Sequence, residues 1–182
     1  LISGVTVKEL REKHEITYHD LLPYASIEKE DIYKSNIEMH YMSYYENWIP
    51  QEIYYYATKH SGYKVNTQRT EGTYAKYSSI DDKCDPFHYY MTLIKFGLGR
   101  ATYDSAHEIR TGHITREEAA ALVGRYDGEF PGKYYDVFLN YCGISEQEFN
   151  SVVDSWRPEH IWKKEGDEWL LRHKVDGSGS DD

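Results

Sequence analysis

Short groups of apolar residues recur at helical spacing through most of the chain, and they predict a mainly helical protein. The signal is strongest after Pro86. Capping boxes at Thr115/Glu118 and Ser145/Glu148 mark the starts of two helices in this part. The five helices predicted here cover residues 87–96, 101–111, 116 to near 126, 132–141, and a last segment that follows Ser145.

The first third of the chain predicts shorter elements. Thr6 and Glu9 fit a capping box for a helix that runs through Lys13. Residues 37–44, Ile-Glu-Met-His-Tyr-Met-Ser-Tyr, alternate with period two and give the one strong strand signal. The other predicted elements are a helix over 27–34 capped by Ser26, and a tyrosine-rich helix over 51–60 with Pro50 at its first position.

Three further segments complete the pattern. Residues 66–85 are polar, aromatic and aperiodic, which indicates a long loop, and loops of this length in compact domains are usually functional or disordered. Five Tyr/Thr positions and almost no Gly/Ser repetition argue against disorder, so we expect an ordered loop. Residues 161–172 predict a hairpin that turns at Gly166-Asp167, and residues 176–182 predict a disordered tail. A single strand before residue 80 excludes a complete doubly wound α/β domain. The chain is therefore either a mostly helical domain or the back part of a larger protein.

Composition limits the possible classes. The 182 residues suit one ordinary domain, and no window approaches the roughly 18 apolar residues that a spanning helix needs. The first residues lack the pattern of a signal peptide, so we expect a cytoplasmic protein without a membrane span. The only cysteines, Cys84 and Cys142, have no paired spacing, so neither a disulfide framework nor a metal site is predicted.

The charge balance points away from nucleic acids. The formal net charge is -10, so the phosphates of a duplex would be repelled. Residues 61–115 carry 7 Lys/Arg against 6 Asp/Glu and form the only third that is not acidic. If the protein binds a phosphate-bearing ligand, we expect the cations that bind it to lie in this segment. The chain also has 19 tyrosines, whose runs we expect to be half-buried against a core or a partner surface.

The run 95–102, Lys-Phe-Gly-Leu-Gly-Arg-Ala-Thr, lies between two predicted helices. Its glycines permit a tight bend, and the helix that follows points free N–H groups and the positive end of its dipole at that bend. This pattern predicts a receptor for phosphate, pyrophosphate or carboxylate. The alternative is a tight helix crossing with the cations in water. The candidate residues are Lys95, Gly97, Gly99, Arg100 and Thr102.

A second candidate site lies in the long loop. It combines arginine for phosphates, tyrosine for stacking, and carboxylates for hydroxyl groups or Mg²⁺, as a sugar or nucleotide pocket does. The alternative, favoured by composition alone, is a surface loop held by ion pairs. The candidates are Arg69, Glu71, Tyr74, Lys76, Asp81, Asp82 and Lys83. Farther along, Asp104 and His107 share one helix face, which we interpret as a solvated face rather than a proton-transfer cluster.

Several motifs in this order resemble one family. The chain is similar to the C-terminal half of the N-acetyl sugar amidotransferases of surface-polysaccharide biosynthesis. The resemblance covers nearly the whole chain up to the tail. The motifs are Tyr-Tyr-Glu-Asn-Trp at 44–48, Pro-Gln-Glu at 50–52, Arg-Thr-Glu-Gly-Thr-Tyr at 69–74, Asp-Asp-Lys at 81–83, the run 95–102, and Ile-Thr-Arg-Glu-Glu-Ala at 114–119.

The resemblance implies an ATP-dependent enzyme of the PP-loop pyrophosphatase group, which is adenine nucleotide alpha hydrolase-like, acting in lipopolysaccharide and O-antigen biosynthesis. Such an enzyme activates the acetamido oxygen of a nucleotide sugar as an adenylate, and ammonia from a separate glutaminase subunit displaces it to give an acetamidino group. ATP and Mg²⁺ are the implied cofactors. The bend would then hold pyrophosphate, and Arg69, Glu71, Tyr74 and Lys76 would line the nucleotide or sugar side.

The chain departs from the family at its start. The family carries a Ser-Gly-Gly-x-Asp-Ser loop around the ATP phosphates and pairs of cysteines, whereas Ile2-Ser3-Gly4-Val5 is not that loop. We therefore expect a C-terminal piece without assignable catalytic residues, mainly α, with one or two strands left from a parallel α/β sheet. Residues 1–65 would end the nucleotide-binding domain, 66–175 would form a helical domain, and 176–182 a tail. The alternatives are a non-catalytic helical module for oligomerisation or glutaminase docking, and a helical adaptor unrelated to nucleotides.

Overall fold

The computed structural model describes residues 5–14 and 16–177 and divides the chain into two compact units. The first unit ends at Asn47 and the second begins at Trp48. The sequence places the domain boundary later, after residue 65. The earlier division follows from Tyr54, whose ring stacks on Tyr77 with 5.1 Å between centroids and so joins the tyrosine-rich helix to the second unit.

The first unit consists of short helices. The capping box of the first helix is confirmed, because Glu9 N–H donates to Thr6 Oγ1 at 3.1 Å. The predicted helix over 27–34 begins later, after Glu28 rather than Ser26, and ends at Ser35, followed by Asn36 in the left-handed region with φ 51°. The elements are α1 (Val7–His14), α2 (Tyr18–Leu21), η1 (Leu22–Tyr24), α3 (Lys29–Ser35) and η2 (Met42–Tyr44).

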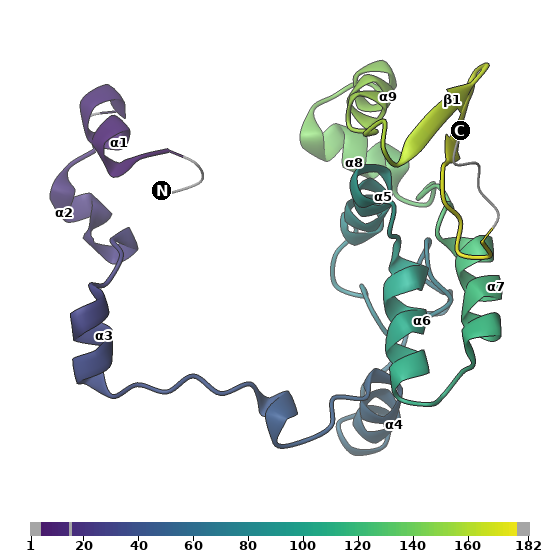
Figure 1. Cartoon of the computed structure of the whole chain (residues 1–182), viewed down its shortest axis with the longest axis horizontal. Coiled ribbons are helices and arrows are strands. Elements are labelled where there is room, and N and C mark those ends of the chain that lie inside the picture. Colours follow the sequence, from purple (N-terminus) through teal and green to yellow (C-terminus); the bar gives the residue numbers. More distant parts are fainter. Residues whose placement is uncertain (1–4, 15, 178–182) are drawn as a thin grey trace. The chain divides into compact units, whose positions relative to one another are not determined.

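The predicted strand over 37–44 is wrong. Residues 37–41 have no regular secondary structure and run as an open segment between α3 and η2 (Figure 1), with Tyr41 in the extended region and no partner strand. Met42–Tyr44 form a turn of 3-10 helix, closed by Tyr45 N–H donating to Met42 O at 3.0 Å. An isolated extended segment has no partner for its backbone groups, so pattern alone does not make it a strand. The only sheet in the described residues is an antiparallel pair near the C-terminus, so no strand of a parallel sheet is present there.

The second unit confirms the predicted helices and the hairpin. Both predicted capping boxes are formed at Thr115 and Ser145. The helix expected over 132–141 begins later, at Tyr135. The elements, in the order seen in Figure 1, are α4 (Pro50–His60), α5 (Asp85–Phe96), α6 (Arg100–Arg110), α7 (Arg116–Tyr126), α8 (Tyr135–Cys142), α9 (Glu146–Ser155), β1 (Trp162–Glu165) and β2 (Glu168–Leu171).

The core of the second unit is aromatic and centres on α5. Phe87 is 1% exposed and stacks on Phe138 of α8, with 4.1 Å between ring centroids. Phe149 of α9 meets the same ring edge-on. These ring contacts join α5, α8 and α9 into one packed group. Burying each such side chain contributes about 1.5–3 kcal/mol to the stability of the fold.

The hairpin is fastened to this core. Glu165 pairs with Glu168 across a turn in which Gly166 has φ 62°, as the predicted turn requires. At the other end of β1, buried Trp162 donates its indole N–H to the carbonyl of Ile94 at 2.6 Å. Within the described residues, no helix is both long and apolar enough to cross a membrane.

Candidate functional site

The loop before α5 is ordered, as predicted. Asn66 N–H donates to Lys76 O and Thr70 N–H donates to Ala75 O, both at 3.1 Å, so the loop folds back on itself. Thr73 is fully buried at the centre of this fold, and Thr70 Oγ1 donates to Ser78 O at 3.0 Å. The loop therefore has its own internal hydrogen bonds and can hold side chains in fixed positions.

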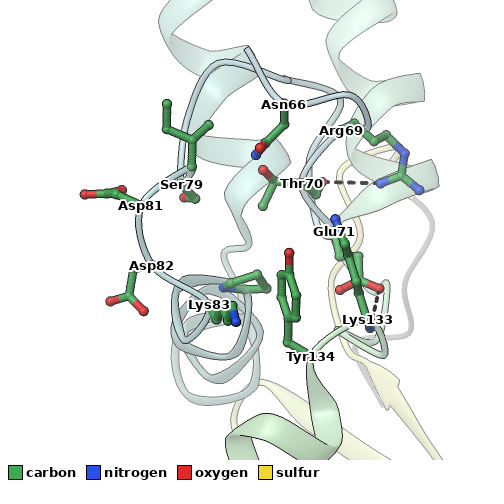
Figure 2. Close-up of a pocket in the computed structure, with 12 residues that line it drawn as sticks. Asn66, Arg69, Thr70, Glu71, Ser79, Asp81, Asp82, Lys83, Lys133 and Tyr134 are labelled. Atoms are coloured by element: carbon green, nitrogen blue, oxygen red, sulfur yellow. Dashed lines mark hydrogen bonds between the residues drawn. The ribbon is translucent and has the colours of Figure 1, made fainter. Parts of the chain in front are cut away.

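This loop surrounds a polar pocket of about 140 Å³. Five of the seven predicted loop residues line it, while Tyr74 and Lys76 do not. Figure 2 shows Tyr134 rising between Lys83 and Glu71. The full lining consists of Asn66, Arg69, Thr70, Glu71, Ser79, Ile80, Asp81, Asp82, Lys83, Pro86, Lys133 and Tyr134.

Arg69 anchors one wall of the pocket. Its guanidinium forms a bidentate pair with Glu129, in which Nη1 donates to Oε2 at 2.5 Å and Nη2 donates to Oε1. Glu129 also accepts from Gly72 N–H at 2.9 Å. Hydrogen bonding to Arg69 lowers the pKa of Glu129, and the same contact raises the pKa of Arg69. Arg69 is thus engaged by the protein and positions the loop.

The opposite wall presents cations around one aromatic ring. The Nζ atoms of Lys83 and Lys133 lie 5.6 and 5.0 Å from the centroid of the Tyr134 ring. Glu71 accepts from Lys133 N–H at 3.0 Å, which ties this segment to the loop. Asp82 accepts from Cys84 N–H at 2.7 Å at the start of α5. Carboxylates can bind hydroxyl groups, ammonium groups can bind an anion, and the ring can support the apolar face of a sugar.

The volume limits the ligand. A cavity of about 150 Å³ holds one benzene-sized ring, whereas drug-sized ligands occupy about 300–1,000 Å³. A pocket of about 140 Å³ therefore accepts one ring-sized group of a ligand and leaves the remainder outside.

Sequence reasoning missed Lys133 and Tyr134. They precede α8 and reach the loop only through tertiary contacts such as Glu71–Lys133. The local signal at 131–134, Pro-Gly-Lys-Tyr, indicates a turn before a helix but does not reveal what the turn contacts.

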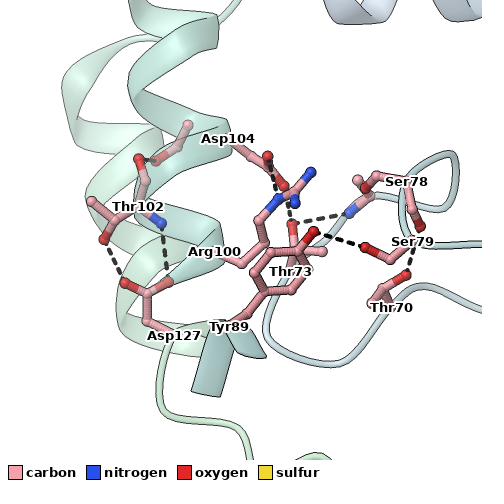
Figure 3. A network of polar contacts seen from close by, with 11 residues as sticks. Thr70, Thr73, Ser78, Ser79, Tyr89, Arg100, Thr102, Asp104 and Asp127 are labelled. Carbon is pink, nitrogen blue, oxygen red and sulfur yellow. Dashed lines mark hydrogen bonds and ion pairs between the residues drawn. The ribbon is translucent and has the colours of Figure 1, made fainter. Parts of the chain in front are cut away.

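The bend 95–102 already holds an anion that belongs to the protein. Gly99 N–H donates to the carboxylate of Asp127 at 3.1 Å. Thr102 N–H donates to it at 3.0 Å, and Thr102 Oγ1 donates to it as well (Figure 3). A Cβ on Gly99 would lie 2.5 Å from Asp127 Cγ, so only glycine permits this approach. Gly97 ends α5 in the left-handed region with φ 72°. The start of α6 is therefore an anion receptor filled by Asp127.

The two predicted cations of the bend have separate partners. Lys95 Nζ lies 5.1 Å from the Trp156 ring centroid. Arg100 Nε donates to Asp104 Oδ1 at 2.8 Å, and its Cζ lies 4.5 Å from the Tyr89 ring centroid. Pyrophosphate binding at this bend stays a prediction, and it requires the ligand to displace Asp127.

The interpretation of Asp104 as part of a solvated face is wrong. Its side chain is 12% exposed and accepts from Thr73 Oγ1 at 2.7 Å. His107 has a different partner from Asp104, because its Nε2 lies 3.0 Å from Trp48 O. Burial raises the pKa of Glu108 one turn along, and it raises the pKa of Tyr77 to about 12. Asp104 lies under the loop and not in water.

A chain of hydrogen bonds and one cation–π contact connects α6 to the pocket. Arg100 joins Asp104 and stacks on Tyr89, whose hydroxyl accepts from Ser79 Oγ at 3.0 Å (Figure 3). Ser79 lines the pocket. Arg100 thus supports the pocket wall from behind. Among the described residues, no group of three or more His, Cys, Asp or Glu side chains is arranged to hold a metal ion.

The comparisons with known proteins identify one family. Residues 71–175 match the model of the family described as LPS biosynthesis protein WbpG-like, C-terminal domain. The match covers more than half of the chain and includes Glu71, Lys83, Tyr134 and the bend. No curated protein matches the chain.

Proposed function

Because the chain belongs to the family of LPS biosynthesis proteins with a WbpG-like C-terminal domain, we propose that it is the C-terminal part of an ATP-dependent N-acetyl sugar amidotransferase. It would act in the cytoplasm on a nucleotide sugar during O-antigen synthesis, with a glutaminase subunit as the source of ammonia. The PP-loop affiliation belongs to this proposal.

In the proposed reaction, the acetamido oxygen attacks the α-phosphorus of ATP and releases pyrophosphate. Ammonia then adds to the activated carbon, and AMP leaves with the former acetamido oxygen. The products are the acetamidino sugar, AMP and pyrophosphate. Such a reaction needs a site that holds the sugar still beside the nucleotide and stabilises developing negative charge.

The pocket around Tyr134 is the observation that supports this proposal. It combines one aromatic face, two ammonium groups and several carboxylate and hydroxyl groups in a volume of about 140 Å³. We assign it to the sugar of the nucleotide sugar, with Lys83 and Lys133 beside the attached phosphates. The family resemblance assigns the ATP phosphates to a loop whose motif the sequence does not contain.

Asp81 and Asp82 would hold the Mg²⁺ that the family resemblance implies, at the same pocket. Asp81 and Asp82 are exposed carboxylates at the pocket. Mg²⁺ commonly binds one or two carboxylates together with substrate phosphates, so this pair fits the ion. When bound, Mg²⁺ would neutralise phosphate charge, while the carboxylates only orient it.

Turnover by the complete protein tests the proposal. We expect ATP, Mg²⁺, ammonium and a nucleotide-linked N-acetyl sugar to yield a product in which NH replaces one oxygen, as mass spectrometry would detect. Tyr134→Leu and Lys83→Ala should lower this turnover. Lys76→Ala is the matched control, because Lys76 is an exposed lysine of the same loop outside the pocket. Equal activity of Lys83→Ala and Lys76→Ala at subsaturating sugar would contradict the assignment.

A further inference from the structure

Residues 37–41 form an extended segment with large exposed apolar side chains. Ile37, Met39 and Tyr41 are 76%, 80% and 72% exposed. Within the part of the chain that the structure describes, residues 37–40 make no backbone–backbone hydrogen bond. An extended segment of this kind is a template for pairing with another strand.

The segment is complementary to itself. If two copies lie antiparallel with Met39 opposite Met39, Ile37 faces Tyr41 and Glu38 faces His40 of the other copy. The odd residues share one face and the even residues share the other. Glu38 Oε2 and His40 Nε2 already lie 2.9 Å apart within one chain, so both polar groups are on the same side. A twofold axis through Met39 therefore matches apolar with apolar and carboxylate with imidazole.

We propose that residues 37–41 pair with the same residues of a second copy of this chain, as antiparallel strands centred on Met39. A C2 contact of this type uses the same surface on both copies and is self-complementary. The pairing explains why the strongest strand signal in the sequence falls on a segment that is unpaired in a single chain. The proposal is independent of the proposed function, since no pocket residue belongs to this segment.

The contact is short, and this limits its strength. Two five-residue strands alone are marginal in water. Met42 directly follows the segment and is also exposed, whereas the Tyr45 ring stacks on His40 of the same chain. We therefore expect a weak dimer, with a dissociation constant in the micromolar range or above.

Cysteine crosslinking tests the register. The background carries Cys84→Ser and Cys142→Ser to remove the native thiols. Opposite Cα atoms of antiparallel strands lie about 4.5–5.5 Å apart, within the range of about 4.4–6.8 Å for a disulfide. Met39→Cys should therefore form a disulfide dimer under mild oxidation.

The matched controls are Ile37→Cys and Tyr41→Cys. In this register, residue 37 of one chain and residue 37 of the other are offset by four positions along the strands, about 13 Å. The same holds for residue 41, so neither variant alone should crosslink. A mixture of the two variants should give a disulfide-linked dimer that contains one chain of each. Equal crosslinking at all three positions, or none at Met39→Cys, would overturn the proposal.

Charge reversal provides a second test on the chain with its native cysteines. His40→Glu would place Glu38 opposite a carboxylate twice in the dimer and should weaken association about 2- to 30-fold. Adding Glu38→Lys should restore it, because opposite charges then face each other again. Sedimentation velocity over a concentration series measures both effects. A chain that stays monomeric up to millimolar concentration, or a double variant no better than His40→Glu, would refute the pairing.

Discussion

The carboxylate of Asp127 caps α6 from a position 28 residues away from its first partner, Gly99. Asp127→Ala removes three accepted hydrogen bonds at a site where the residue is 9% exposed. The N–H groups of Gly99 and Thr102 and the Thr102 hydroxyl would lose their acceptor. A hydrogen bond to a charged group is worth about 1.5–3 kcal/mol, and a carboxylate at a helix N-terminus adds about 0.3–1 kcal/mol.

The contributions overlap, since a water molecule can replace part of the lost bonding. We therefore expect Asp127→Ala to lower the free energy of unfolding by about 2–4 kcal/mol. Asp127→Asn keeps one acceptor oxygen but turns an amide NH₂ toward the other backbone N–H, because each carboxylate oxygen accepts one, and it should cost about 1–3 kcal/mol. Urea unfolding followed by tryptophan fluorescence measures both. The control is Asp136→Ala, an exposed carboxylate in the first turn of α8, with an expected loss of at most about 1 kcal/mol.

Two results would refute this reasoning. Wild-type stability in Asp127→Ala would mean that the cap contributes nothing, and wild-type stability in Asp127→Asn would mean that the second acceptor oxygen is irrelevant. The same variant tests the pyrophosphate prediction. Pyrophosphate that must displace Asp127 should bind Asp127→Ala more tightly than wild type, and at 100 times its Kd it should stabilise the variant by about 2.7 kcal/mol. An equal shift in both proteins would place the ion elsewhere.

Three further predictions concern side chains in the second unit. Hydrogen bonding to Arg69 lowers the pKa of Glu129 below 4.5, so the stability from this pair is present above pH 4.5 and lost as pH falls through the lowered pKa. The free energies of unfolding of wild type and Glu129→Gln should therefore differ above pH 4.5 and converge below the lowered pKa. The pKa of Tyr77 is raised from 10.0 to about 12 by burial, so Tyr77→Phe should remove one late step from the ultraviolet phenol titration, and wild type should lose stability as pH rises from 10 through 12. Trp162→Phe leaves Ile94 O without its indole donor and should cost about 2–3 kcal/mol in urea unfolding, and an unchanged midpoint would show that this bond is dispensable.

Features with local causes could be predicted from the sequence. The capping boxes at Thr115 and Ser145 form within four residues, so their pattern is sufficient to place the starts of α7 and α9. The hairpin turn at Gly166 is equally local. The residue types of Glu71 and Lys83 suit a polar pocket, and both residues line it.

Features that depend on distant partners could not be predicted. Residues 37–41 have the alternation of a strand, but a strand exists only when another pairs with it. The sequence indicates an anion receptor before α6, but it does not reveal that Asp127 fills it, because that contact is tertiary. The places of Tyr134 and Asp104 escape prediction for the same reason, since loop packing decides their surroundings.

We propose that the pocket around Tyr134 receives the sugar of a nucleotide sugar. The most direct measurement is calorimetric titration of the chain with UDP-N-acetylglucosamine, for wild type, Lys83→Ala and Lys76→Ala. Removing a charge-assisted contact at a partly exposed pocket should weaken binding roughly five- to tenfold. We expect this loss for Lys83→Ala and wild-type affinity for Lys76→Ala. No binding by wild type, or the same affinity in both variants, would contradict it.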